Sequence, residues 1–163
     1  MREEAGELVE LLKAKGLKIT TAESCTGGMV AAAITDVGGS SGVFERGFVT
    51  YCNEAKHDML GVKKKTLKEY GAVSKETVRE MAKGAAKAAG ADVAVSLSGI
   101  AGPGGGSAEK PVGLVYMGVY VKGHLKSRKF NFEGDREAVR NSAVCAALKL
   151  VIRQIRKWDE HDG

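Results

Sequence analysis

Ser24 and Lys56 are the two side chains whose types and surroundings point most directly to chemistry. Ser24 lies in the segment TTAESCTGG, residues 20–28, where a short β-branched stretch runs into small residues and then two glycines. This pattern predicts a turn from a strand into a helix, which leaves backbone N–H groups at the helix start free to bind an anion. A serine hydroxyl at such a turn can attack a carbonyl carbon while neighbouring amides stabilise the developing oxyanion.

The backbone after this serine is predicted to form the oxyanion site. Main-chain amides from Thr26 to Gly28 are expected to hold the negative oxygen, and Gly27 and Gly28 let a ligand approach because they have no Cβ atom. The simpler alternative is that Ser24 or Thr26 only caps the following helix.

A serine nucleophile needs a base, and the three histidines of the chain are poorly placed to supply one. His161 lies in the tail and His124 follows a turn glycine, so only His57 is near the predicted site. Lys56 follows the second predicted strand, and a cleft lined by helix N-termini would lower the pKa of its ammonium enough for it to act as a base. Ser-Lys pairs are a known form of this arrangement. The alternative for Lys56 is a solvated position on a helix surface.

Three further features allow more than one interpretation. Cys25, next to the serine, is either a low-pKa thiol at a helix start or a small packing residue. The glycine-rich loop 99–106 lacks the glycine directly before Lys110 that a triphosphate-binding loop requires, so we interpret it as a flexible wall of a ligand pocket. Arg136 and Arg140, one helical turn apart, either bind phosphate through paired guanidinium donors or form surface salt bridges.

Composition and charge narrow the classes of protein to which the chain can belong. The net charge of +5 is scattered along 163 residues, which argues against a nucleic-acid-binding patch and suits an anionic small molecule. No metal-ligand spacing occurs, no cofactor is expected, and no apolar run approaches the roughly 18 residues of a membrane span. The three cysteines are widely spaced without a secretory leader, so we expect reduced thiols in a cytoplasmic protein. We also expect a homo-oligomer.

The elements that must position these residues alternate along the chain. Glycines mark helix ends, Ser74 and Asp135 are typical N-caps, and Lys122-Gly123 predicts a tight hairpin turn. Helices are predicted over residues 2–15, 26–37, 53–60, 66–70, 74–89 and 135–157, and strands over 17–22, 46–51, 92–97, 112–121 and 125–132. Together they predict one α/β domain over residues 1–163, a three-layer sandwich in which helices cover both faces of a mixed β-sheet.

Five segments carry a resemblance to a known family. They are TTAESCTGG, ERGFVTYCNEAK (45–56), YGAVS (70–74), SLSGIAGPGGGSAEKPVG (96–113) and GDREAVR (134–140). In this order they resemble the C-terminal domain of the competence-damage-inducible protein, and the resemblance covers nearly the whole chain. In some members this domain follows an N-terminal molybdopterin-binding-like domain, and here we expect the stand-alone form.

The resemblance implies an amidohydrolase that converts nicotinamide mononucleotide to nicotinic acid mononucleotide and ammonia in pyridine nucleotide salvage. The serine of ESCTGG would be the nucleophile and the lysine of NEAK the base, with an acyl-enzyme intermediate. Tyr51 and Asn53 would line the site, with Gly102 in its glycine-rich wall, and Arg140 would bind phosphate or orient the catalytic groups. The rival function is a non-catalytic nucleotide-binding or regulatory module, in which the helix start and Arg140 bind phosphate without chemistry.

Overall fold

A five-stranded mixed sheet forms the centre of the protein, for which the computed structural model describes residues 1–162. Its strands are β1 (Ile19–Glu23), β2 (Phe48–Val49), β3 (Val93–Gly99), β4 (Leu114–Val121) and β5 (His124–Asn131), in the spatial order β2-β1-β3-β4-β5. β1 pairs in parallel with β2 and β3, whereas β3, β4 and β5 pair antiparallel. The mixed sheet confirms the sequence prediction.

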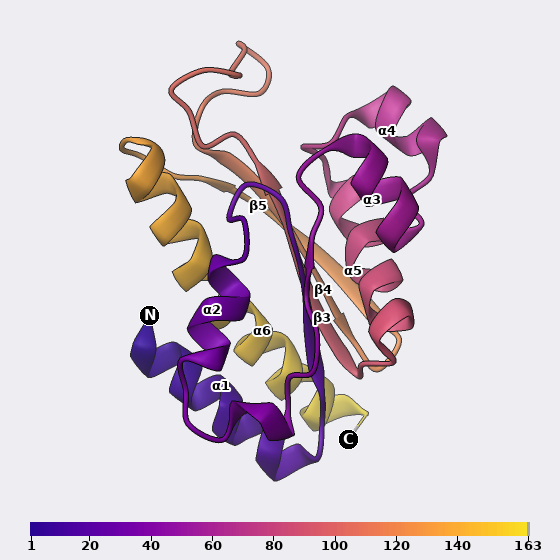
Figure 1. Ribbon diagram of the computed structural model, residues 1–163, viewed down its shortest axis with the longest axis vertical. Helices are drawn as coiled ribbons and strands as arrows, with labels where there is room; N and C mark the ends of the chain where they lie inside the picture. Colours follow the sequence, from indigo (N-terminus) through magenta and orange to yellow (C-terminus); the bar gives the residue numbers. More distant parts are fainter. Residues whose placement is uncertain (163) are drawn as a thin grey trace.

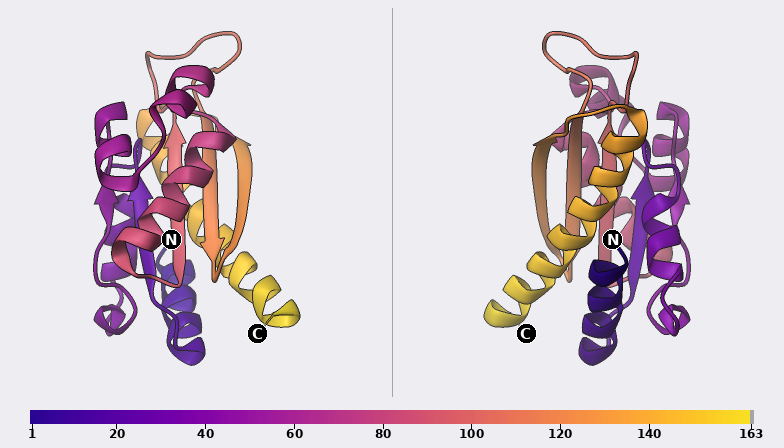
Figure 2. Two further views of the ribbon diagram at one scale, coloured as in Figure 1. Left: turned by 90° about the vertical axis from the view of Figure 1, so that its right-hand side faces the viewer. Right: turned by 90° about the vertical axis from the view of Figure 1, so that its left-hand side faces the viewer.

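Helices cover both faces of this sheet, as Figures 1 and 2 show. On one face, α1 (Arg2–Lys15), α2 (Met29–Thr35) and α6 (Arg136–His161) enclose the larger part of the apolar core. A short 3-10 turn, Ser40–Gly42, follows α2. The loop between β3 and β4 projects beyond the end of the sheet (Figure 1).

The opposite face carries the smaller part of the core. It is covered by α3 (Asn53–Leu60), α4 (Lys64–Tyr70) and α5 (Lys75–Ala89), of which α5 packs along β1, β3 and β4 (Figure 2). The three-layer α/β architecture is therefore confirmed. Within residues 1–162, no helix combines the length and the apolar character that crossing a membrane requires.

The residues predicted to cap helices or to form the hairpin turn do so in the structure. Ser74 Oγ accepts the N–H of Thr77 at 3.2 Å at the start of α5, and Asp135 Oδ1 accepts the N–H of Ala138 at 2.9 Å at the start of α6. Lys122 and Gly123 adopt positive φ angles of 47° and 92° in the tight turn between β4 and β5. These local interactions explain why the elements near them could be located from sequence.

Most predicted boundaries are shifted by one or two residues, and three elements show larger or more informative differences. The helix expected over 26–37 begins only at Met29, because Gly27 and Gly28 adopt positive φ angles of 55° and 105° that an α-helix does not contain. The strand expected over 46–51 pairs only at Phe48–Val49, and the final helix continues to His161.

Gly84 allows α3 and α5 to pack closely on this second face. A Cβ atom at residue 84 would lie 1.8 Å from the carbonyl oxygen of Leu60, the last residue of α3. Gly84→Ala should therefore lower the free energy of unfolding by about 1–3 kcal/mol, measured by urea denaturation. Gly6→Ala in α1 is the matched control, since its Cβ meets no atom within 4 Å and should be neutral or stabilising. Equal stability of the Gly84→Ala and wild-type proteins would contradict this account of the packing.

Candidate active site

A cavity of about 280 Å³ at the carboxyl ends of β1 and β3 holds several of the side chains that the sequence singles out. Ser24 directly follows β1, and its N–H donates to the carbonyl oxygen of Leu97 at 3.0 Å, so the parallel pairing continues past the strand. The polar and charged lining residues are Ser24, Tyr51, Lys56, Ser98 and Arg136, and glycines that include Gly102 form part of the wall.

Lys56 lies in the first turn of α3 and is only 1% exposed. Its Nζ atom lies 2.9 Å from Ser24 Oγ, 2.8 Å from the carbonyl oxygen of Thr50 and 3.4 Å from that of Tyr51. Burial lowers the pKa of the Lys56 ammonium. In the described part of the chain no carboxylate forms an ion pair with it. The alternative of a solvated lysine on a helix surface is therefore wrong.

The surroundings of the Lys56 amine suit its neutral form. A neutral amine has two N–H donors and one lone pair, and here two carbonyl oxygens and one hydroxyl lie around it. The carbonyls of Thr50 and Tyr51 can accept the two N–H groups, which leaves the lone pair facing the Ser24 hydroxyl. This arrangement can remove a proton from the hydroxyl when the oxygen attacks an electrophile.

Glu23 organises the turn behind the serine and is fully buried. Its carboxylate accepts the Thr26 hydroxyl at 2.6 Å and the backbone N–H groups of Val30 and Ala31 at 2.8 and 3.1 Å. The expectation that all N–H groups at this helix start are free is wrong, because Glu23 binds two of them inside the protein. Neither Ser24 nor Thr26 acts as the side-chain cap of α2, whose N-cap residue is Gly28.

These contacts make Glu23 a stabilising residue with a testable contribution. In Glu23→Gln one carboxylate oxygen becomes an NH₂ group that faces an N–H or O–H donor, and a charge-assisted acceptor is lost. We expect the free energy of unfolding to fall by about 1.5–3 kcal/mol in urea denaturation. Glu45→Gln is the control, because its exposed pair with Lys18 should contribute less than about 1 kcal/mol. A loss no larger than that of the control would contradict the role of Glu23.

The peptide groups after Ser24 are partly committed to internal contacts. The N–H of Gly27 donates to the carbonyl oxygen of Ser24 at 3.0 Å, whereas within residues 1–162 the N–H groups of Cys25 and Thr26 donate to no protein acceptor. Arg140 donates from Nε to the Cys25 carbonyl at 3.0 Å and from Nη2 to the Thr26 carbonyl at 3.4 Å. Arg140 therefore holds this turn from behind, which fits the orienting role among its two expected roles.

Two residues on the rim of the cavity are linked by one arginine. Arg136 donates from Nη1 to the carbonyl oxygen of Gly102 at 2.8 Å and from Nη2 to the hydroxyl of Tyr51 at 3.1 Å. Tyr51 is 62% exposed, so its ring stands at the entrance. Arg136, at the start of α6, therefore connects the glycine-rich wall of the cavity to its entrance.

Several expected site residues lie outside this cavity. Asn53 lines a separate hollow with His57, whose Nδ1 lies 2.8 Å from the carbonyl oxygen of Val62. Thr26 is fully buried against Glu23, and Gly27 and Gly28 are not among the lining residues. Their contacts with substrate stay predictions from the sequence.

Ser98 lines the cavity although it was not predicted as a site residue. Glu23 pairs with Leu97 in the β1–β3 register, so Ser98 is the neighbour of Ser24 on the same face of the sheet. Adjacent strands lie about 5 Å apart, which puts the two hydroxyl-bearing residues side by side. The SLSG segment contains this serine, but its place beside Ser24 can be inferred only once β3 is known to pair with β1.

Cys25 does not have the environment of a reactive thiol. Burial is the main cause that raises the pKa of this thiol to about 11, and the nearby Glu23 carboxylate acts in the same direction. The low-pKa alternative for Cys25 is therefore wrong. Over residues 1–162, no group of three or more His, Cys, Asp and Glu side chains is arranged to hold a metal ion.

The chain matches known proteins in family model and in sequence. The family model of the CinA C-terminal domain matches residues 2–155. The chain is 59% identical over 152 residues to a nicotinamide-nucleotide amidohydrolase, PncC, from Enterobacter agglomerans, with 93% of each protein covered. It is 58% identical over 146 residues to the protein of the same name from Escherichia coli strain K12, covering 89% of this chain and 88% of that protein.

Solved structures show the same fold. The competence/damage inducible protein CihA from Agrobacterium tumefaciens superposes with a TM-score of 0.91 at 46% identity, covering 93% of both chains. A CinA superfamily protein from Klebsiella pneumoniae superposes with a TM-score of 0.93 at 38% identity, covering 96% of this chain and 98% of that one. Matching in family model, sequence and fold over almost its full length, the chain belongs to the CinA C-terminal domain family.

Proposed function

We propose that the protein is an amidohydrolase that converts nicotinamide mononucleotide to nicotinic acid mononucleotide and ammonia. The observation that carries this proposal is the 2.9 Å contact between Ser24 Oγ and the buried Lys56 Nζ beside a cavity. The identity of 58–59% to two nicotinamide-nucleotide amidohydrolases supports the substrate. A cytoplasmic location, a homo-oligomer and the extent of the domain over residues 1–163 stay predictions.

The first half of the proposed reaction acylates the serine. Neutral Lys56 takes the proton of the Ser24 hydroxyl as the oxygen attacks the carboxamide carbon. The N–H groups of Cys25 and Thr26, which follow the nucleophile, are available to bind the oxyanion. The protonated lysine then gives its proton to the departing ammonia, and a nicotinoyl ester remains on Ser24.

The second half removes the acyl group. A water molecule attacks the ester carbon, Lys56 accepts one of its protons, and this proton returns to Ser24 as the carboxylic acid leaves. The same lysine thus serves as base and acid in both halves, for which a lowered pKa is needed at neutral pH.

An ammonia-coupled assay tests this function directly. Nicotinamide mononucleotide, nicotinamide riboside and free nicotinamide are supplied separately, and we expect ammonia release to be fastest with the nucleotide. The rival function, a nucleotide-binding or regulatory module, predicts thermal stabilisation by the nucleotide with no ammonia from any of the three. A steeply salt-dependent affinity for oligonucleotides would instead favour a nucleic-acid-binding protein.

A further inference from the structure

Two segments from different parts of the fold form walls of the catalytic cavity. The loop between β3 and β4, residues 100–113, contributes its glycine-rich first half. The connection between α4 and α5 contributes Ala72 and Val73. The position of the β3–β4 loop relative to this connection therefore sets the space that a substrate finds beside the catalytic serine.

The α4–α5 connection is firmly held to the first turn of α5. The carbonyl oxygen of Gly71 accepts the hydroxyl of Ser74 at 2.9 Å and the hydroxyl of Thr77 at 2.7 Å. Both of these side chains are buried, so water does not compete for the two hydrogen bonds. The connection is thus a fixed support against which a more mobile segment can be held.

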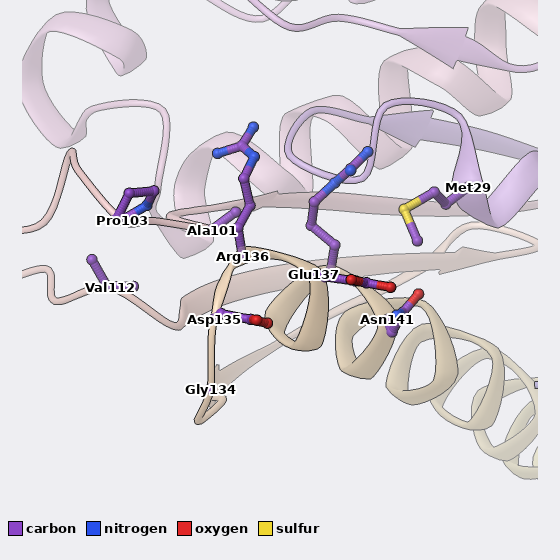
Figure 3. Close-up of a pocket in the computed structure, with 10 residues that line it drawn as sticks. Met29, Ala101, Pro103, Val112, Gly134, Asp135, Arg136, Glu137 and Asn141 are labelled. Atoms are coloured by element: carbon purple, nitrogen blue, oxygen red, sulfur yellow. The ribbon is translucent and has the colours of Figure 1, made fainter.

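The β3–β4 loop projects beyond the end of the sheet, and its residues 103–109 are exposed (Figure 1). Its two legs pack against each other, because a Cβ atom at Gly102 would lie 2.5 Å from Cγ1 of Val112, and Figure 3 shows Pro103 and Val112 on these legs. Arg136 binds the first leg through the carbonyl oxygen of Gly102. Since glycine-rich chain has large conformational freedom, the exposed part beyond this contact depends on further contacts to keep one position.

Lys110 supplies such a contact from the second leg. Its Nζ donates to the carbonyl oxygen of Tyr70, the last residue of α4, at 2.7 Å. The last carbonyl groups of a helix have no partner within it and attract a cation. Gly71 leaves room for the ammonium, since a Cβ atom there would lie only 3.1 Å from Nζ.

The backbone of Lys110 is fixed at the tip of the loop. Its N–H donates to Ser107 Oγ at 3.0 Å, and its carbonyl oxygen accepts the N–H of Ser107 at 2.8 Å. A side chain that starts from this closed turn and ends on α4 therefore holds the tip of the loop, and not only its own residue, against the α4–α5 connection.

We propose that Lys110 is a positioning residue for the reaction, which holds the β3–β4 loop to the α4–α5 connection and so keeps the catalytic cavity formed before substrate binds. This rests on the proposed function. Lys110 is not among the residues that line the cavity, so it acts through the loop and not by touching the substrate. Without this contact the loop would have to be ordered when the substrate binds, and that cost would appear mainly in KM.

Steady-state kinetics and amide hydrogen exchange of Lys110→Met and Lys110→Arg test this role. In Lys110→Met we expect kcat/KM to fall about 3- to 10-fold, mostly through KM, by the same factor for nicotinamide mononucleotide and its riboside. Exchange of residues 100–113 should become several-fold faster in the same variant. Lys110→Arg keeps a cationic donor and should restore both measurements most of the way to the wild-type values. The control Lys75→Met removes the same charge from an exposed position at the start of α5 and should change neither.

The outcomes separate this proposal from the proposed function. Unchanged exchange of the loop in Lys110→Met, or faster exchange with unchanged kcat/KM, would overturn the positioning role. A loss confined to the nucleotide would also overturn it, because Lys110 would then contact the phosphate itself. If the wild-type protein released no ammonia from any substrate, the proposed function would fail, whereas hydrogen exchange would still decide whether Lys110 holds the loop.

Discussion

Ser24→Ala should abolish ammonia release from nicotinamide mononucleotide, with kcat lowered on the order of 10⁴-fold or more. The alanine removes the only atom that can form the acyl-enzyme bond, while the turn held by Glu23 and Arg140 stays intact. Binding of the nucleotide, measured by calorimetric titration, should change by no more than a few-fold. The two measurements together separate the loss of chemistry from the loss of the site.

A covalent intermediate gives this prediction a direct readout. Rapid quenching of the wild-type reaction followed by mass spectrometry should reveal a nicotinoyl adduct on Ser24, and Ser24→Ala should show none. Ser127→Ala on the edge strand β5 is the control, since it removes a hydroxyl that is not among the cavity-lining residues and should retain full activity. Near-normal turnover by Ser24→Ala would mean that another group is the nucleophile.

Lys56→Met should lower kcat/KM by about 10²- to 10⁴-fold, the range associated with loss of a general base. Methionine keeps an unbranched side chain in the buried position but cannot accept the serine proton. In the wild-type protein, kcat/KM should rise with pH through the lowered pKa of Lys56 and level off below the ordinary lysine value of 10.5. The variant's residual activity should lack this rise, as a pH-rate profile of both proteins will show.

The same substitution should change how the stability of the fold depends on pH. Since the folded-state pKa of Lys56 lies below 10.5, the unfolded chain binds more protons between these two values, and wild-type stability gains with rising pH in that window. Burial of the charged amine therefore costs most below the folded-state pKa and nothing above about 10.5. The difference in unfolding free energy between Lys56→Met and wild type should favour the variant most at low pH, shift toward the wild type through this window and become constant above about 10.5.

Two outcomes would contradict the assignment of Lys56. One is a pH profile of activity that is identical in the wild-type protein and in Lys56→Met. The other is a stability difference between the two proteins that does not change with pH. The exposed lysine control Lys83→Met, on α5, should reproduce neither effect.

Local interactions made much of the fold predictable. Ser74, Asp135 and the Lys122-Gly123 turn each act within a few residues, so their elements were found close to their observed bounds. The strand predicted over 46–51 was too long at both ends. The length of the observed strand depends on its pairing with β1, which the segment itself does not specify. The start of α2 was misplaced because Gly27 and Gly28 adopt positive φ angles, so the helix begins only at Met29.

The order of residue types along the chain determined the α/β class and the turn that carries Ser24. The residue types also determined that a serine and a lysine were chemically suited to act as nucleophile and base. Only the tertiary structure decided that the two meet, because they lie 32 positions apart and the contact depends on where α3 is held by its packing on α5. Packing also lowered the pKa of Lys56, left Asn53 outside the cavity and gave the two arginines different surroundings. Burial and the direction of a side chain are properties of the assembled layers, which no local pattern specifies.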